Sequence, residues 1–184
     1  MQLVTEQRKS YIEPGNIYFW TATINNWQKL LFPEEPKKII IDSLAYLSAN
    51  RKIEVYGFVI MPNHIHLIWK TIEKNGKETP QGSFLKFTAH AFKKYLLSAN
   101  PGELSNYAVT AHNKNYEFWQ RDSLAIQLYT IEIAYQKLDY IHFNPVAEHW
   151  KLCTDPIAYY YSSARFYETS KDDFGFLKHL GNEF

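Results

Sequence analysis

Three short stretches of the chain have the residue types and lengths of β-strands. Residues 17–25 (IYFWTATIN) and 53–60 (IEVYGFVI) are rich in β-branched and aromatic side chains, which are enriched in strands. Residues 64–70 (HIHLIWK) have the same character, and only residues 61–63 (MPN) separate them from the second stretch. Two strands joined by so short a turn pair as an antiparallel hairpin. The pattern therefore predicts three strands, the last two joined in a hairpin.

Three other segments carry apolar residues at helical spacing. The first opens with prolines and covers residues 33–50, and proline suits the first turn of a helix. A second helix is expected over residues 83–98, and a third over residues 128–144, where Pro145 ends it.

One further strand candidate, residues 116–119, lies between the second and third helices. The resulting order of elements predicts an α+β fold of the ferredoxin-like or RRM-like type, with helices packed on one face of an antiparallel sheet. We expect one domain over residues 1–184, with its core at about residues 17–150 and an aromatic tail, residues 151–184, packed on the body. Such folds serve many functions, so the function must be argued from a site.

The composition is that of an ordinary globular domain with an excess of aromatic residues. Hydrophobic residues make up 46% and charged residues 21% of the 184 residues, enough for one well-filled core. Aromatic residues make up 17%, and such side chains can stack on unpaired bases as well as fill a core. The net charge of +1 argues against a duplex binder. Positive charge that contacts nucleic acid must therefore be local.

The chain has the features of a cytoplasmic protein without a membrane partner. Its one cysteine, Cys153, allows no intrachain disulfide, which points to a reducing compartment. Residues 1–11 lack the apolar centre of a secretory signal. No apolar run approaches the roughly 18 residues of a membrane span.

His64 and His66 are the first candidates for chemistry. They lie two apart on a predicted strand, so both imidazoles project from the same face and Ile65 from the other. Two convergent imidazoles are half of a divalent metal site. On this spacing alone chance is the more common explanation, because two ligands do not make a site.

The last predicted helix adds a tyrosine and an amide. Tyr140 and Asn144 lie one turn apart and share a face, and the Asn144 carboxamide oxygen can bind a metal ion. Tyr140 falls far from the centre of the apolar stripe of the helix, so it is not an obvious core residue. A tyrosine lying on the protein surface is the alternative. The stripe consists of Ile131, Ala134, Leu138 and Ile141.

Other tyrosines fit a catalytic role less well. Tyr135 is the closest rival, because Asp139 follows it by one turn, but Tyr135 lies nearer the apolar stripe. The run of residues 159–161 (YYY) has no paired polar ligand and is interpreted as packing.

Two sequence blocks resemble a family of DNA enzymes. MPNHIHLIW, residues 61–69, is similar to the HUH signature (His, a hydrophobic residue, His) of single-strand endonucleases. KLDYIHFNPV, residues 137–146, resembles the tyrosine motif of the REP-associated tyrosine transposases, cousins of the single-tyrosine insertion-sequence transposases. The outline of the family fits from about residue 17 to residue 163, including FWQRD at residues 118–122 and YSS at residues 161–163. His-x-His alone is a weak signal, but joined to YIHFNP it is strong.

The resemblance implies a role for each site residue. His64 and His66 match the histidine ligands of a divalent metal, Asn144 matches the third ligand, and Tyr140 matches the nucleophile. The metal of the family is Mg²⁺ or Mn²⁺, and two imidazoles with an amide suit Mn²⁺ somewhat better. The implied activity is that of a transposase, a single-strand DNA endonuclease and strand transferase that forms a 5′-phosphotyrosine intermediate. The sequence does not identify the base that takes the tyrosine proton.

The resemblance also implies single-stranded DNA with hairpin elements as the partner, and it favours a monomer over a homodimer. Lys86, Lys93 and Lys94 can form a basic helix face that contacts phosphates, although a solvated helix face is the more common explanation. Trp119 and Arg121 are candidates for base stacking or contact with the DNA backbone.

Two functions of other classes stay open on the sequence. One is a non-catalytic RRM-like protein that binds single-stranded nucleic acid, which the presence of all four site residues disfavours. The other is a zinc-dependent hydrolase that uses His64 and His66. The lack of a third His or Cys at the usual zinc spacing argues against that enzyme.

Overall fold

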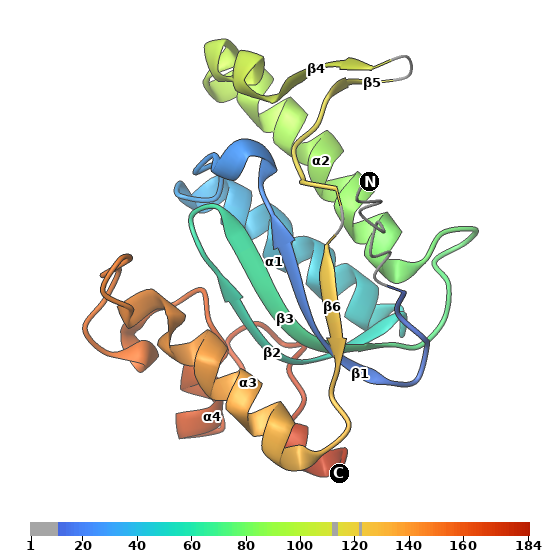
Figure 1. Cartoon of the computed structure of the whole chain (residues 1–184), viewed down its shortest axis with the longest axis vertical. Helices are drawn as coiled ribbons and strands as arrows, with labels where there is room; N and C mark the ends of the chain where they lie inside the picture. Colours follow the sequence, from blue (N-terminus) through green and yellow to red (C-terminus); the bar gives the residue numbers. More distant parts are fainter. Residues whose placement is uncertain (1–10, 112–113, 122) are drawn as a thin grey trace, which may run out of the picture.

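An antiparallel four-stranded sheet forms the centre of the computed structural model, which describes residues 11–111, 114–121 and 123–184. Residues 1–10, most of the segment predicted to lack a secretory signal, lie outside the described residues. The sheet has the strand order β2-β3-β1-β6 (Figure 1). Its strands are β1 (Ile17–Thr23), β2 (Ile53–Ile60), β3 (His64–Thr71) and β6 (Leu124–Gln127).

This strand order is the ferredoxin-like order, so the predicted α+β class is confirmed. The predicted position of the fourth strand, residues 116–119, is wrong. Tyr116 ends a separate hairpin of β4 (Ala108–Ala111) and β5 (Lys114–Tyr116), and the two aromatic residues that follow are both buried. The fourth strand is β6, a four-residue edge strand whose side chains are exposed or half-buried. So short and polar an edge strand carries little sequence signal.

Helices cover both faces of the sheet, and the expectation of helices on one face is therefore wrong. α1 (Glu34–Ala49) and α2 (Pro80–Ala99) pack on one face, and α3 (Ile131–Phe143) packs on the other (Figure 1). Because successive side chains of a strand point to opposite faces of the sheet, alternate residues of each strand pack against the helices on either side. The α1/α2 layer contains the stacked rings of Trp20 and Trp69, whose centroids are 4.9 Å apart.

Capping residues set where α2 and α3 begin. α2 starts earlier than predicted, because the Thr79 hydroxyl accepts a hydrogen bond from the backbone N–H of Gly82 and Pro80 occupies the first turn. α3 starts later than predicted, because Thr130 caps it by accepting from the N–H of Ile133. A short 3₁₀ turn, η3 (Asn144–Val146), follows α3 directly. The candidate residues Tyr140 and Asn144 therefore lie at the C-terminal end of this helix.

A glycine in β2 allows α3 to lie close against the sheet. A Cβ atom placed on Gly57 would be 2.6 Å from Cδ1 of Leu138 and 3.2 Å from Cδ1 of Ile141. Both of these side chains belong to the buried stripe of α3. A larger residue would therefore force these two side chains to shift.

The tail after α3 runs along the free edge of β2. The backbone N–H of Ile60 donates to the carbonyl of Tyr161, and the N–H of Lys178 donates to the carbonyl of Val55. These bonds cover an edge that would otherwise expose unpaired backbone groups. The tail also contains a short helix, α4 (Ala164–Thr169). Within the described part of the chain, no helix has the length and apolar character needed to cross a membrane.

We predict that Gly57→Ala lowers the free energy of unfolding by roughly 1 to 3 kcal/mol, because the added methyl group overpacks the contact between β2 and α3. Urea denaturation measures this change. Gly102→Ala is the matched control, since a Cβ atom there would meet nothing nearer than 3.9 Å. Equal destabilisation by the two substitutions would contradict the proposed close contact.

Candidate active site

The two histidines of β3 lie side by side beneath α3. His64 and His66 project from the sheet face that α3 covers, and their ring centroids are 4.7 Å apart. Only 8% of the surface of His64 and 6% of that of His66 is exposed. The strand period thus places both imidazoles together, as the sequence predicted.

A neighbouring oxygen atom orients each imidazole. The Nδ1 atom of His66 lies 2.7 Å from the hydroxyl of Thr21, and that of His64 lies 2.7 Å from Oδ1 of Asn63. The Asn63 amide nitrogen donates to the carbonyl of Trp27, which leaves Oδ1 to accept from His64. With its proton on Nδ1, each ring would present the lone pair of its Nε2 atom. The Nε2 atom of His66 is buried and has no hydrogen-bond partner among the described residues.

Burial keeps both rings neutral at physiological pH. It lowers the pKa of His66 to about 3, with further lowering by His64 and Lys137. It lowers the pKa of His64 to about 4, with a smaller contribution from His149. Because a metal ion binds the neutral imidazole, folding prepares both rings for ligation. The two neutral imidazoles could therefore both bind a metal ion, and the unpartnered Nε2 atom of His66 is one atom that could do so.

α3 brings Tyr140 and Asn144 to the same place. The ring centroid of Tyr140 is 5.4 Å from that of His66, and Tyr140 is 53% exposed. Asn144 is buried and follows one turn later. A hollow of about 280 Å³ opens beside them. It is lined by His64, Tyr140, Phe143, Asn144, Ala147, His149 and Trp150.

A buried histidine between these two residues fastens the helix to the sheet. The Nε2 atom of His142 lies 2.8 Å from the Ser163 hydroxyl, which in turn accepts from the backbone N–H of Phe58 in β2. Burial lowers the pKa of His142 to about 4, so the ring is neutral. Both residues belong to sequence blocks that resemble the family, but neither block predicts their contact. The helix phase, which points His142 away from Tyr140, was the available signal.

Three other tyrosines, Tyr135, Tyr159 and Tyr161, pack against other parts of the protein. The ring of Tyr135 packs in the apolar layer beneath α3, with its hydroxyl beside Gly181. Tyr159 donates to the carbonyl of Ile60, and Tyr161 lies in the core. These contacts leave Tyr140 as the tyrosine that lies beside the histidine pair and is open to solvent.

The predicted lysine face lies across the sheet from the histidines. Lys86, Lys93 and Lys94 belong to α2, which covers the opposite sheet face. The ammonium group of Lys86 pairs with Glu78, and that of Lys93 lies over the ring of Tyr116. The structure therefore does not bring these lysines to the candidate site.

The two candidates from the FWQRD block have different positions. Trp119 is buried, and its indole nitrogen donates to the hydroxyl of Thr88, so its place in the core does not fit the predicted stacking on a base. Arg121 is largely exposed and donates to Glu117. It also lines a small hollow together with Thr21, the residue that contacts His66. Asp122 of the same block lies outside the described residues.

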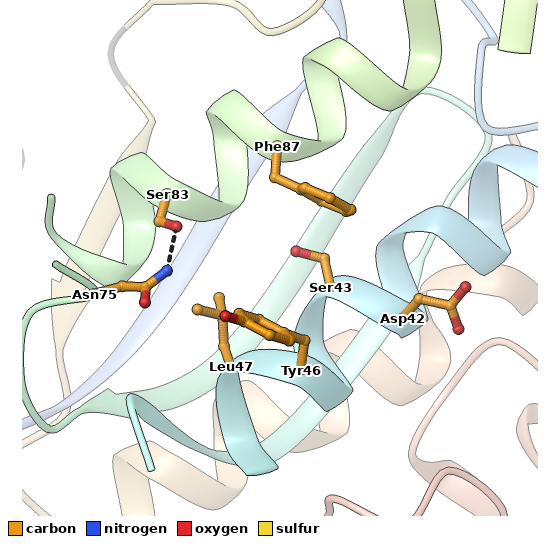
Figure 2. A pocket seen from close by; sticks show the side chains of 7 residues that line it. All are labelled: Asp42, Ser43, Tyr46, Leu47, Asn75, Ser83 and Phe87. Atoms are coloured by element: carbon orange, nitrogen blue, oxygen red, sulfur yellow. Dashed lines mark hydrogen bonds between the residues drawn. The ribbon is translucent and has the colours of Figure 1, made fainter. Parts of the chain in front are cut away.

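A second hollow of about 360 Å³ lies between α1 and α2, on the far side of the sheet (Figure 2). Figure 2 shows the rings of Tyr46 and Phe87 at its opening and a hydrogen bond from Asn75 to Ser83. It contains no histidine or cysteine, and none of the predicted site residues lines it. This hollow therefore shares no residue with the one beside His64 and Tyr140.

Any metal ion at this site would need the amide of Asn144. Among the described residues, no group of three or more His, Cys, Asp or Glu side chains is placed to hold a metal ion. A three-ligand zinc centre of the hydrolase type uses such side chains. Two imidazoles and one carboxamide oxygen are the donors that the described site offers instead.

Comparison with known proteins gives a match of fold. No family model matches the chain, and no curated protein matches it. A solved structure of a REP-associated tyrosine transposase bound to a REP hairpin aligns with 92% of this chain and 90% of its own, with a TM-score of 0.59 and 17% identity. A protein provisionally described as a transposase, from Deinococcus radiodurans R1, aligns with 72% of this chain and 92% of its own. Its TM-score of 0.41, at 17% identity, is too low to support an argument.

We predict that stability against denaturant falls as the pH is lowered from 7 toward 4. The folded chain holds the pKa of His64 and His142 at about 4 and that of His66 at about 3, against 6.5 for a free side chain. Below pH 6.5 the unfolded chain therefore binds protons that the folded chain does not. Each histidine then lowers the free energy of unfolding by on the order of 1 kcal/mol per pH unit, until the pH reaches the pKa of that histidine in the folded chain.

Urea unfolding at pH 7 and pH 5 measures this dependence. A His142→Gln variant should lose stability less steeply, because one of the three groups no longer titrates. Equal free energies of unfolding of the native chain at both pH values would contradict the burial of neutral imidazoles.

Proposed function

We propose that this chain, which has the fold of a REP-associated tyrosine transposase, is a metal-dependent single-strand DNA endonuclease and strand transferase. The observation that carries the proposal is the placement of an exposed tyrosine beside two buried, neutral imidazoles. The rings of Tyr140 and His66 are 5.4 Å apart, although 74 residues separate them in sequence. A tyrosine can act as the nucleophile in phosphodiester cleavage, and a metal ion held by neighbouring ligands can offset the charge of the phosphate.

His64, His66 and Asn144 would hold the metal ion, Mn²⁺ or Mg²⁺. The unpartnered Nε2 atom of His66 supports this assignment, because a buried nitrogen lone pair without a partner costs free energy in the absence of a ligand. The bound ion would offset negative charge on the scissile phosphate. The hydrogen bonds between the two imidazoles and Thr21 and Asn63 fix the orientation of the rings before any ion arrives.

Tyr140 would be the nucleophile. Its exposed side chain can reach a phosphodiester, whereas the buried tyrosines cannot. Attack would form a bond between the tyrosine oxygen and phosphorus and break the bond from phosphorus to the 3′ oxygen. The 5′ end would stay attached to the protein and a 3′ hydroxyl would be released. Since the phosphotyrosine retains the energy of the broken bond, a second 3′ hydroxyl could reverse the step and join strands without ATP.

The surroundings of Tyr140 suit an unpaired strand. Phe143 is 59% exposed and, with Trp150, lines the hollow beside Tyr140. Exposed aromatic rings are platforms on which unpaired bases stack. The transposase of the same fold was solved with a REP hairpin, and we propose hairpin-bearing single-stranded DNA as the partner of this chain.

A non-catalytic RRM-like binder fits the structure less well. Such proteins stack bases on aromatic side chains of an open sheet face. Here α1 and α2 cover one face, and α3 lies on β2 and β3 of the other. Little sheet surface of that kind therefore remains.

We predict that Tyr140→Phe abolishes a covalent protein–DNA adduct that the native chain forms. The assay uses labelled single-stranded oligonucleotides that carry hairpins from the flanks of the gene, with Mn²⁺ or Mg²⁺, analysed on a denaturing gel. Removal of the hydroxyl removes the attacking atom, so the yield should fall below detection. Tyr135→Phe is the matched control on the same helix and should keep the adduct. Tight binding of DNA by all variants without any adduct would favour the non-catalytic binder.

We also predict that Mn²⁺ raises the thermal unfolding midpoint of the native chain. At a concentration one hundred times the dissociation constant, a ligand specific for the folded state stabilises it by about 2.7 kcal/mol. His64→Ala and His66→Ala should lose this shift, whereas Tyr140→Phe should keep it because the tyrosine is not a ligand. If Mn²⁺ raised the thermal midpoint of the histidine variants as much as that of the native chain, the ion would bind at another site.

A further inference from the structure

Lys137 lies one turn before Tyr140 on the same face of α3. Its ammonium nitrogen is 5.8 Å from the ring centroid of Tyr140 and 5.1 Å from that of Phe19. It is also close enough to His66 to lower the pKa of that ring further. Lys137 begins the block KLDYIHFNPV, and the family resemblance assigns it no role. The fold thus places a cation at the edge of the candidate site.

This cation has no anionic partner within the part of the chain that the structure describes. Lys70 and Lys86, in contrast, are paired with carboxylates. An unpaired ammonium group beside the proposed nucleophile favours an anionic ligand.

We propose that Lys137 binds a non-bridging oxygen of the scissile phosphate and thereby orients that phosphate for attack by Tyr140. The inference rests on the proposed function and adds a catalytic residue to it. Lysine is a common phosphate ligand, which acts as a point charge. Negative charge on the phosphoryl oxygens must be stabilised during the transfer, so a fixed ammonium group there accelerates the step.

The chemistry balances without another reactant. The Tyr140 oxygen forms a bond to phosphorus as the bond from phosphorus to the 3′ oxygen breaks. The tyrosine proton passes to solvent, and the 3′ oxygen takes up a proton from solvent. Lys137 takes no part in these proton transfers and contributes charge and position only.

A purely structural role is the competing explanation. The Lys137 ammonium group lies over the ring of Phe19, and such a cation–π contact can stabilise the folded chain. Lys137→Met keeps an unbranched apolar side chain over the ring and removes the charge. Lys137→Arg keeps the charge. Lys77→Met removes a lysine from an exposed loop and serves as the matched control.

The test measures the rate of adduct formation in a single turnover at saturating DNA, together with the Kd for the same hairpin oligonucleotide. Lys137→Met should slow the reaction by about 100-fold, the effect of removing one group that stabilises transition-state charge. Its Kd should change far less, and its thermal midpoint should stay near that of the native chain. Lys137→Arg should restore most of the rate, and Lys77→Met should react like the native chain.

The outcomes separate the two proposals. If the native chain forms an adduct and Lys137→Met forms it at the same saturating rate, the assignment of Lys137 is overturned and the proposed function stands. A slow Lys137→Arg variant with a lowered thermal midpoint would also overturn it, in favour of the structural role. If the native chain forms no adduct with either metal, the proposed function fails and the inference fails with it.

Discussion

The close attachment of α3 to β2 is the contact on which the whole site depends. Gly57 provides the space for the helix, and the bonds from His142 to Ser163 and from Phe58 to Ser163 hold it there. The catalytic candidates lie on different elements, two on β3 and two at the end of α3. Without the attachment they would share no surface. A buried hydrogen-bonded network of this kind restrains position more strongly than apolar packing alone, because each member left unpaired would cost free energy.

The site combines buried, neutral donors with an exposed nucleophile. Burial of His64 and His66 costs the protein the hydration of both rings, and the bonds to Thr21 and Asn63 recover only part of it. Within the part of the chain that the structure describes, the Nε2 atom of His66 has no hydrogen-bond partner. Functional sites commonly contain a buried polar atom without a hydrogen-bond partner, because a bound ligand can then supply the missing interaction. Tyr140, which must meet a large substrate, lies at the rim.

Charge is arranged locally rather than over the whole surface, as a net charge of +1 requires. The lysines of α2 are across the sheet from the site, and one of them is paired. Arg121 and Lys137 lie on the side of the histidines. Aromatic side chains at the hollow, among them Phe143 and Trp150, offer stacking surface without charge. Recognition by stacking and by a few placed cations suits an unpaired strand better than a duplex.

The sequence alone determined the fold class, three of the four sheet strands and the three long helices. The strands are rich in β-branched and aromatic residues, and the helices carry apolar residues at helical spacing. The sequence also predicted that His64 and His66 share a face, since strand geometry alone requires it. Only the tertiary structure decided the rest. Trp119 lies in the core, β6 is the fourth strand, and His142 reaches Ser163 because distant segments pack together. Such contacts follow from the burial of side chains against partners far away in the chain, and no local pattern records them.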